Sequence, residues 1–311
     1  MIDKMINKAL QNYDFINPQV ELIRHNENMT YKVMDENKSY VFRIHEPTEG
    51  FNVDLIKADI VKEELIAGEM EVLDYLADTI LVQKPKLNIS GEPVSLLNDG
   101  KLVTILNWID GTTLEFIDMT SEIAFLLGKM IGRLHNALSK APNKQRYHYD
   151  DKLISRMMTE ASYAFKQGYF TEHQANLIND TLSIIKDYLS KTSNRFILVH
   201  SDLSKSNLIY HNEMLTPIDF SLSGYCVPEM DLASAFSHIN DEVLNVEILK
   251  GYKTMCNNEI DEAGIDICFC LQILLFVVCQ YDKFAHEDWF KEKIDEWGEK
   301  YFSPLIQLRS M

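Results

Sequence analysis

The sequence predicts a two-lobed α+β protein in which a strand-rich N-terminal lobe precedes a larger, mainly helical lobe. Up to about residue 106, short alternating apolar runs separated by turn residues dominate, which is typical of strands. From about residue 112, apolar residues recur at helical spacing. The length of 311 residues also suggests roughly two domains. We expect an N-terminal lobe at 1–106, a hinge at 107–111 and a C-terminal lobe at 112–311.

The N-terminal lobe is predicted to be an antiparallel sheet with one long helix. The expected strands cover residues 20–25, 29–34 and 39–45, with a turn at 35–38. A helix is expected from about Asp54 to Leu76, because Leu65, Val72, Leu73 and Leu76 form an apolar stripe. Residues 92–108 then predict a hairpin that turns at Asn98-Asp99-Gly100.

The C-terminal lobe contains several amphipathic helical patterns and one group of strands. One helix is expected over 121–138, and another after Thr171, which forms a capping box with Gln174. Strands are expected only between about 196 and 218. The apolar run Ile267–Cys279 is too short to span a bilayer and contains Gln272, so it predicts a buried helix.

Charge and cysteine content narrow the classes of partner and compartment. The net charge of −17 disfavours nucleic acid and anionic membranes as partners. From Glu229 to Glu299, 16 acidic residues stand against 5 lysines. This excess is either a solvated surface or a site for a cationic ligand. Five cysteines without a visible signal peptide fit a reducing cytoplasm, and we interpret Cys268 and Cys270 as buried rather than metal-binding.

The segment "FILVHSDLSKSNLIYHNEMLTPIDF", residues 196–220, carries the strongest functional pattern. Two short strands joined by a polar turn lie between Asn207 and Asp219, so antiparallel pairing brings these two residues to one end of a hairpin. An amide oxygen beside a carboxylate suits Mg²⁺ that bridges nucleotide phosphates. Asp202, on the loop that leads into this end, is placed to deprotonate an acceptor hydroxyl.

Each of these residues has a structural alternative when taken alone. Asp202 or Asn207 could simply be a turn or cap residue, and we interpret His200 as structural. The combination of Asp, Asn five residues later and Asp after a hairpin is instead typical of kinase-like phosphotransferases.

A phosphotransferase also needs a cation for the phosphates. Arg43 lies within an expected strand, and Glu69 interrupts the apolar stripe of the expected 54–76 helix. A carboxylate that faces a core needs a partner, so we expect Arg43 and Glu69 to pair. Glu64 and Glu71 are the alternatives on the helix, and a surface arginine with a boundary glutamate is the structural alternative for the pair.

With these motifs in order, nearly the whole chain resembles the aminoglycoside phosphotransferase and choline kinase superfamily, small-molecule kinases with a protein-kinase-like fold. The matching segments are "NMTYKV", "YVFRI", "GEMEVLDYL", "LNWIDG", "IGRLHNAL", "HSDLSKSNLIY", "IDF" and "MDLASAF". The resemblance implies that Asp202 is the catalytic base, that Asn207 and Asp219 hold Mg²⁺, and that Asp231 supports the catalytic loop. It also implies an ATP or GTP site formed by Asn28, Arg43, Glu69, Asn107 and Ile109.

The chain departs from the family pattern in its nucleotide loop, "RHNENMTYKV", which contains no glycine, and at Ser201, where glycine is common. The expected activity is an ATP-dependent phosphotransferase for a small cationic acceptor of aminoglycoside type, in a cytoplasmic monomer or homodimer. The alternatives are a choline- or homoserine-type metabolite kinase, a non-catalytic nucleotide-binding protein, and a protein kinase. The sequence does not support a protein kinase, because there is no glycine after Asp219-Phe220 and no Ala-Pro-Glu segment.

Overall fold

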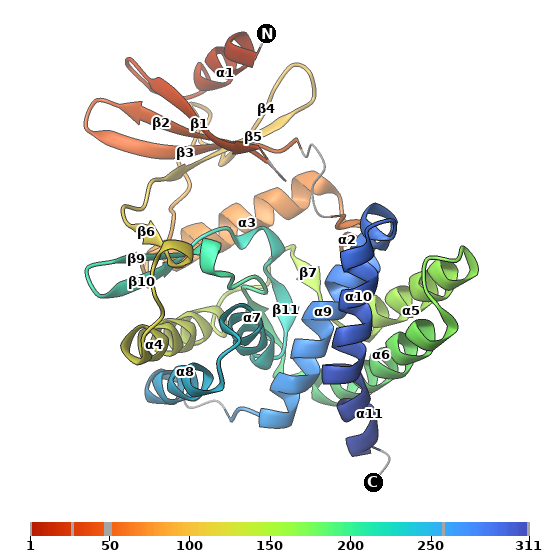
Figure 1. The fold of residues 1–311 in the computed structure, drawn as a ribbon. Helices are drawn as coiled ribbons and strands as arrows, with labels where there is room; N and C mark the ends of the chain where they lie inside the picture. Colours follow the sequence, from red (N-terminus) through yellow and green to blue (C-terminus); the bar gives the residue numbers. More distant parts are fainter. Residues whose placement is uncertain (1, 26–27, 47–51, 257–258, 310–311) are drawn as a thin grey trace.

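The computed structural model describes residues 2–25, 28–46, 52–256 and 259–309. It has the predicted α+β organisation, with an antiparallel sheet lobe above a mainly helical lobe (Figure 1). The sheet has five strands in the order β1-β2-β3-β5-β4. Their bounds are β1 Gln19–His25, β2 Met29–Asp35, β3 Lys38–Ile44, β4 Val94–Leu96 and β5 Leu102–Asn107. The predicted strands, the turn after Asp35 and the hairpin at Gly100 are therefore confirmed.

Each face of this sheet is covered by a different helix. Helix α1, Ile2–Leu10, was not predicted, and its buried Ile6 packs in one cluster with Phe42 and Ile44 of β3. The alternate residue Val41 packs instead with Met70 of helix α3. Since neighbouring side chains of a strand point to opposite faces, Arg43 also lies on the α3 side of the sheet.

The expected single helix over 54–76 is wrong in its first third. The structure has a short α2, Asp54–Lys57, and a separate α3, Lys62–Ala77. Ala58 has a φ of 50°, which no residue of an α-helix adopts, and this ends α2. The predicted apolar stripe lies wholly within α3 and is buried, as Leu65, Val72, Leu73 and Leu76 all are.

The helical lobe is arranged around a long apolar helix (Figure 1). Its helices are α4 Ser121–Leu138, α5 Asp151–Lys166, α6 Glu172–Thr192, α7 Glu229–Ile239, α8 Glu242–Met255, α9 Glu262–Phe284, α10 Asp288–Trp297 and α11 Ser303–Arg309. The predicted bounds of α4 are confirmed, and so is the capping box of Thr171 and Gln174 that starts α6. By length and composition α9 could cross a membrane, but 67% of its most apolar window is buried inside the protein. The predicted buried helix is thus a core helix.

Short strands complete the lobe beneath the large sheet. The predicted group comprises β8 Ile197–Val199, β9 Leu208–His211 and β10 Met214–Pro217. Three further strands were missed: β6 Thr112–Thr113, β7 Tyr147–His148 and β11 Gly224–Cys226. They have only two or three residues each, too few for an alternating pattern to be visible. β6 pairs with β9, while β11 lies between β7 and β8.

Candidate active site

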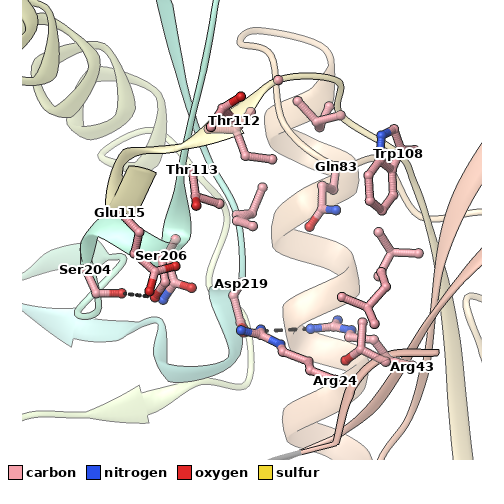
Figure 2. Close-up of a pocket in the computed structure, with 18 of the residues that line it drawn as sticks. Arg24, Arg43, Gln83, Trp108, Thr112, Thr113, Glu115, Ser204, Ser206 and Asp219 are labelled. Carbon is pink, nitrogen blue, oxygen red and sulfur yellow. Dashed lines mark hydrogen bonds and ion pairs between the residues drawn. The ribbon is translucent and has the colours of Figure 1, made fainter. Parts of the chain in front are cut away.

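A cavity of about 740 Å³ lies between the sheet lobe and the helical lobe, and we name it the interlobe cavity. Its two ends differ in chemistry (Figure 2). Trp108 and Ile109 of the expected hinge line one end, with the apolar side chain of Val41. Charged residues of both signs line the other end: Arg24 and Arg43, with Asp202 and Asp219. This pairing of an apolar end with a charged end suits a ligand that has one apolar and one anionic part.

The β9–β10 hairpin brings Asn207 and Asp219 together as the sequence predicted. The strands pair antiparallel with Pro217 opposite Leu208, and the Ile218 N–H donates to the Asn207 carbonyl oxygen at 2.9 Å. The two residues therefore flank the same end of the hairpin. Asp219 has a φ of 63°, a left-handed conformation that is costly for a residue with a Cβ and that must be supported by its surroundings.

Asp202 is joined directly to Asn207. The Asn207 side-chain amide donates to the Asp202 carboxylate at 2.8 Å and to the Asp202 carbonyl oxygen at 3.2 Å. Burial raises the pKa of Asp202, and the nearby charge of Asp219 adds to the rise, while His200 and His238 oppose it. Asp202, Asn207 and Asp219 thus form one connected group at the charged end of the cavity.

The loop that carries Asp202 is anchored from below by Asp231 of α7. The fully buried Asp231 carboxylate accepts the His200 N–H at 3.0 Å, the Ser201 N–H at 2.7 Å and a hydrogen bond with the His135 ring at 2.9 Å. Burial by itself would raise the pKa of Asp231, but these hydrogen bonds and the two histidines hold it below the ordinary value. Gln272, the polar residue in the apolar run, donates to the Ser201 carbonyl oxygen at 3.0 Å.

His200 has the structural role that its sequence context indicated. Its ring is fully buried, lies within 3.1 Å of the Ile218 carbonyl oxygen and accepts the Asp202 N–H at 3.3 Å. It therefore connects the loop of Asp202 to the strand that leads to Asp219. The ring also packs on Phe220, with the ring centres 4.4 Å apart.

On the sheet side, the predicted pair of Arg43 and Glu69 is present and buried. The Arg43 guanidinium donates to the Glu69 carboxylate at 2.8 Å and lies 3.7 Å from the Asp219 carboxylate. Burial works against the charge of Arg43, but Glu69 and Asp219 outweigh it and raise its pKa. Glu64 and Glu71, the alternatives to Glu69, are exposed.

A residue that the sequence did not single out, Arg146, ties α3 to the loop after Asp219. Its side chain is buried, and its guanidinium donates to the carbonyl oxygens of Phe220 at 2.8 Å and Ser223 at 3.0 Å. The same guanidinium donates to the carbonyl oxygen of Leu65 in α3. The helix that carries Glu69 and the loop that carries Asp219 are thereby held against one side chain.

The other predicted nucleotide residues are divided between the cavity and the surface. Asn28 and Ile109 line the interlobe cavity, whereas Asn107 is exposed and does not. Gly111 ends the hinge with a φ of 140°, and a Cβ there would lie 2.5 Å from Ile209. The hinge can therefore approach β9 this closely only with glycine.

Several residues that line the interlobe cavity were missed by sequence reasoning. They are Arg24, Gln83, Trp108, Glu115 and Phe116. Figure 2 shows Glu115 beside Ser204 and Ser206 of the catalytic loop, and Arg24 beside Asp219. The position of Trp108 within the hinge motif was a usable sequence signal. Arg24 and Glu115 gave no such signal, because a single charged residue at either position is ordinary for a protein surface.

The donor set at Asn207 and Asp219 fits a hard cation such as Mg²⁺. The Asp219 Oδ1 atom is buried and accepts no hydrogen bond, and the Asn207 amide nitrogen is already used on Asp202, which leaves its oxygen as the free ligand atom. Carboxylate and amide oxygens are preferred by Mg²⁺. Among the described residues, no cluster of three or more His, Cys, Asp or Glu side chains offers a competing metal site.

Two solved structures with the same two-lobed architecture are small-molecule kinases by their names. An amicoumacin kinase solved with AMP-PNP, Ca²⁺ and Ami matches 96% of this chain and 92% of its own, with a TM-score of 0.76 and 20% identity. A microcompartment-associated aminopropanol kinase matches 96% and 94%, with a TM-score of 0.73 and 19% identity. At these identities the similarity shows the fold, which is the protein-kinase-like fold that the sequence predicted.

The family follows from the sequence itself. The model of the phosphotransferase enzyme family matches residues 19–263, and the chain belongs to this family. The amicoumacin kinase of Bacillus subtilis (strain 168) is 24% identical over 231 residues. That alignment covers 72% of this chain and 64% of the relative.

Proposed function

We propose that this protein is an ATP-dependent kinase that transfers the γ-phosphoryl group to a hydroxyl of a small, cationic molecule of aminoglycoside type. The observation that carries the proposal is the connected group at the charged end of the cavity. Asp202 is hydrogen-bonded to Asn207, and Asn207 lies beside Asp219 across the hairpin end. Phosphoryl transfer requires a general base next to a cation site made of oxygen ligands, and this group of residues offers both.

In this proposal the nucleotide base lies at the hinge, residues 107–111, and the triphosphate extends toward Asp219. The lobes at 1–106 and 112–311 then contribute opposite walls of one site. Arg43 binds phosphate oxygens, and Glu69 holds the guanidinium in place at 2.8 Å. The proposal assigns recognition of the nucleotide base to no side chain of the hinge, so GTP is a second candidate donor.

Asp202 acts as the general base. It accepts the proton of the acceptor hydroxyl while the hydroxyl oxygen forms a bond to the γ-phosphorus and the bond to the β–γ bridging oxygen breaks, which releases ADP. The hydrogen bond from Asn207 fixes one carboxylate oxygen, so the other can face the acceptor. Asn207 and Asp219 would hold Mg²⁺, which when bound neutralises charge on the phosphates.

Glu115 and Phe116 support a cationic acceptor. Both line the interlobe cavity near the catalytic loop, and Phe116 is 81% exposed. A carboxylate beside an exposed aromatic ring attracts an organic cation by charge and by contact with the ring. We expect Glu115→Gln to raise the acceptor KM but not the ATP KM. We also expect the acceptor KM of the wild type to rise with ionic strength, because exposed charges are screened within about 8 Å at physiological salt.

The test is a coupled ADP-release screen with Mg²⁺ and either ATP or GTP against aminoglycosides, choline, homoserine, sugars and peptides. We expect acceptor-dependent ADP release with an aminoglycoside-like cation. A best substrate such as choline or homoserine would move the protein to the metabolite-kinase alternative, and a neutral or anionic one would contradict the cationic acceptor. Nucleotide binding without turnover on any acceptor would favour the accessory role.

We further propose that the enzyme works in the cytoplasm as a monomer or homodimer. All five cysteines are free and buried, which fits a reducing compartment. Size-exclusion chromatography with light scattering distinguishes the two oligomeric states, and a larger assembly would contradict both.

A further inference from the structure

An irregularity in the edge strand of the sheet places a second arginine over the phosphate end of the interlobe cavity. β1 and β2 pair regularly up to Leu22, which is opposite Tyr31, but the next pair is Arg24 with Thr30. Ile23 is therefore an extra residue, that is, a β-bulge. Bulges change the direction in which the following side chains point, and they occur often beside active sites. Here both Ile23 and Arg24 line the cavity.

The bulge completes a polar row across three strands. Arg24 is opposite Thr30, and Thr30 is opposite Arg43 on the other side. Side chains at directly opposite positions share one face of a sheet, so the two arginines flank the threonine over the same part of the cavity. All three residues line it.

Both arginines converge on a single carboxylate (Figure 2). The Arg24 guanidinium lies 3.1 Å from Asp219 Oδ2, and the Arg43 guanidinium lies 3.7 Å from Asp219 Oδ1. These two charges lower the pKa of Asp219 against the effect of its burial. If Asp219 coordinates a cation, it can no longer serve both guanidiniums equally, and they then need another anion.

We propose that Arg24 is a phosphate-binding residue that takes the role of glycine-loop backbone amides, and that it exchanges its partner from Asp219 to the nucleotide phosphates when the metal–nucleotide complex binds. The first glycine of the sequence is Gly50, so the β1–β2 connection has no glycine that would let its backbone approach a phosphate closely. An arginine reaches farther and can bind phosphate with two parallel hydrogen bonds. This inference rests on the proposed nucleotide site.

The exposure of the two arginines fits different roles. The Arg43 side chain is 6% exposed and is fixed by Glu69, whereas the Arg24 side chain is 43% exposed and has Asp219 as its ion-pair partner in the described residues. Because the Arg24 side chain is partly exposed, solvent screens its ion pair with Asp219, so exchange of that pair for a phosphate costs little. Arg24 can therefore move without disturbing the fold.

The experiment measures binding of ATP, ADP and AMP by calorimetry, with Mg²⁺ present, to the wild type, Arg24→Ala, Arg24→Lys and a control, Lys38→Ala. Lys38 is an exposed cation at the far end of the same sheet and does not line the cavity. We expect Arg24→Ala to weaken ATP binding about tenfold or more, because hydrogen bonds to charged groups are strong. The loss should be smaller for ADP and within about twofold for AMP. Arg24→Lys should lie in between, and Lys38→Ala should match the wild type.

The dependence on phosphate number separates a phosphate contact from a structural role. Equal losses for ATP, ADP and AMP, or a lower melting temperature with unchanged ATP affinity, would overturn the inference while leaving the proposed function intact. A wild type that binds neither these three nucleotides nor GTP would overturn both.

Discussion

The two walls of the interlobe cavity are held in place in different ways. On the catalytic-loop wall, the polar groups have buried, fixed partners: Asp231 holds two backbone N–H groups, and Asn207 holds Asp202. On the sheet wall, Arg24 is half exposed and pairs across the cavity with Asp219. Under the proposed function, the groups that deprotonate the acceptor and coordinate the metal have fixed partners before the ligands arrive, as does Arg43 on the sheet wall, whereas Arg24 can change partner.

The largest effect should come from Asp202→Asn. The amide keeps the size of the side chain but cannot accept the hydroxyl proton, and general-base assistance is worth about 10²–10⁴-fold. We expect kcat to fall by that factor while the ATP Kd changes less than about threefold. The carboxamide oxygen of the variant can still accept the hydrogen bond from Asn207, so the melting temperature should change little.

Steady-state ADP release, ATP titration and thermal melting measure the three quantities. Turnover near the wild-type rate would mean that Asp202 is only a loop residue and that the proposed general base is wrong.

Asp231→Asn should have the next largest effect, on stability. It replaces a fully buried carboxylate that serves several donors, and disrupting such a buried charged group typically costs about 3–5 kcal/mol. Asp241→Asn is the matched control, because Asp241 caps α8 by accepting the N–H groups of Val243 and Leu244, and asparagine caps equally well. Urea unfolding measures both. A similar loss in the two variants would mean that Asp231 holds its loop no more firmly than an ordinary helix cap holds a helix end.

The same carboxylate predicts a pH dependence of stability. The pKa of Asp231 is lowered in the folded state, so its contribution to stability is fully present above the unfolded value of 3.8 and is lost as pH falls through the folded value. The difference in unfolding free energy between wild type and Asp231→Asn should therefore shrink below about pH 4. A difference that stays constant between pH 7 and pH 3 would contradict the assignment of Asp231 as a charged anchor.

Asp219→Ala should remove the magnesium-dependent part of ATP stabilisation. A ligand at 100 times its Kd stabilises a protein by about 2.7 kcal/mol, and we expect the Mg²⁺-dependent share of this to vanish because Asp219 is proposed as a metal ligand. Thermal shifts with ATP, with and without Mg²⁺, measure it. A shift that persists unchanged in the variant would locate the metal elsewhere.

Ser201→Gly should have the smallest effect. Ser201 has a φ of 69°, which costs a residue with a Cβ about 1–2 kcal/mol, and glycine avoids this cost but makes the unfolded chain more flexible. The two terms nearly cancel, so we expect the unfolding free energy to change by about 1 kcal/mol or less. Gly91→Ala is the control, since Gly91 has a φ of 82° with open space around it and should show the same two terms with opposite sign and without a side-chain contact. A large destabilisation by Ser201→Gly would mean that the serine side chain itself holds the loop.

The sequence alone determined the features that depend on local spacing. The hairpin between Asn207 and Asp219 followed from two short apolar runs and a polar turn, and strand pairing then fixes where its ends lie. The sequence also predicted that Glu69 needs a cation, with Arg43 as the candidate, but the contact joins residues 26 positions apart and was decided by the tertiary structure. The capping box of α6 is likewise a local signal.

Only the tertiary structure decided the features that depend on contacts between distant segments. Arg146 reads as a surface residue in the sequence, yet carbonyl oxygens of two other segments surround its guanidinium. Arg24 lies in the cavity because of a β-bulge. In a strand of seven residues, one extra residue does not change the pattern of apolar and polar residues enough to be recognised in the sequence. The strands of two or three residues were also not predictable, since they exist only through pairing with strands far along the chain.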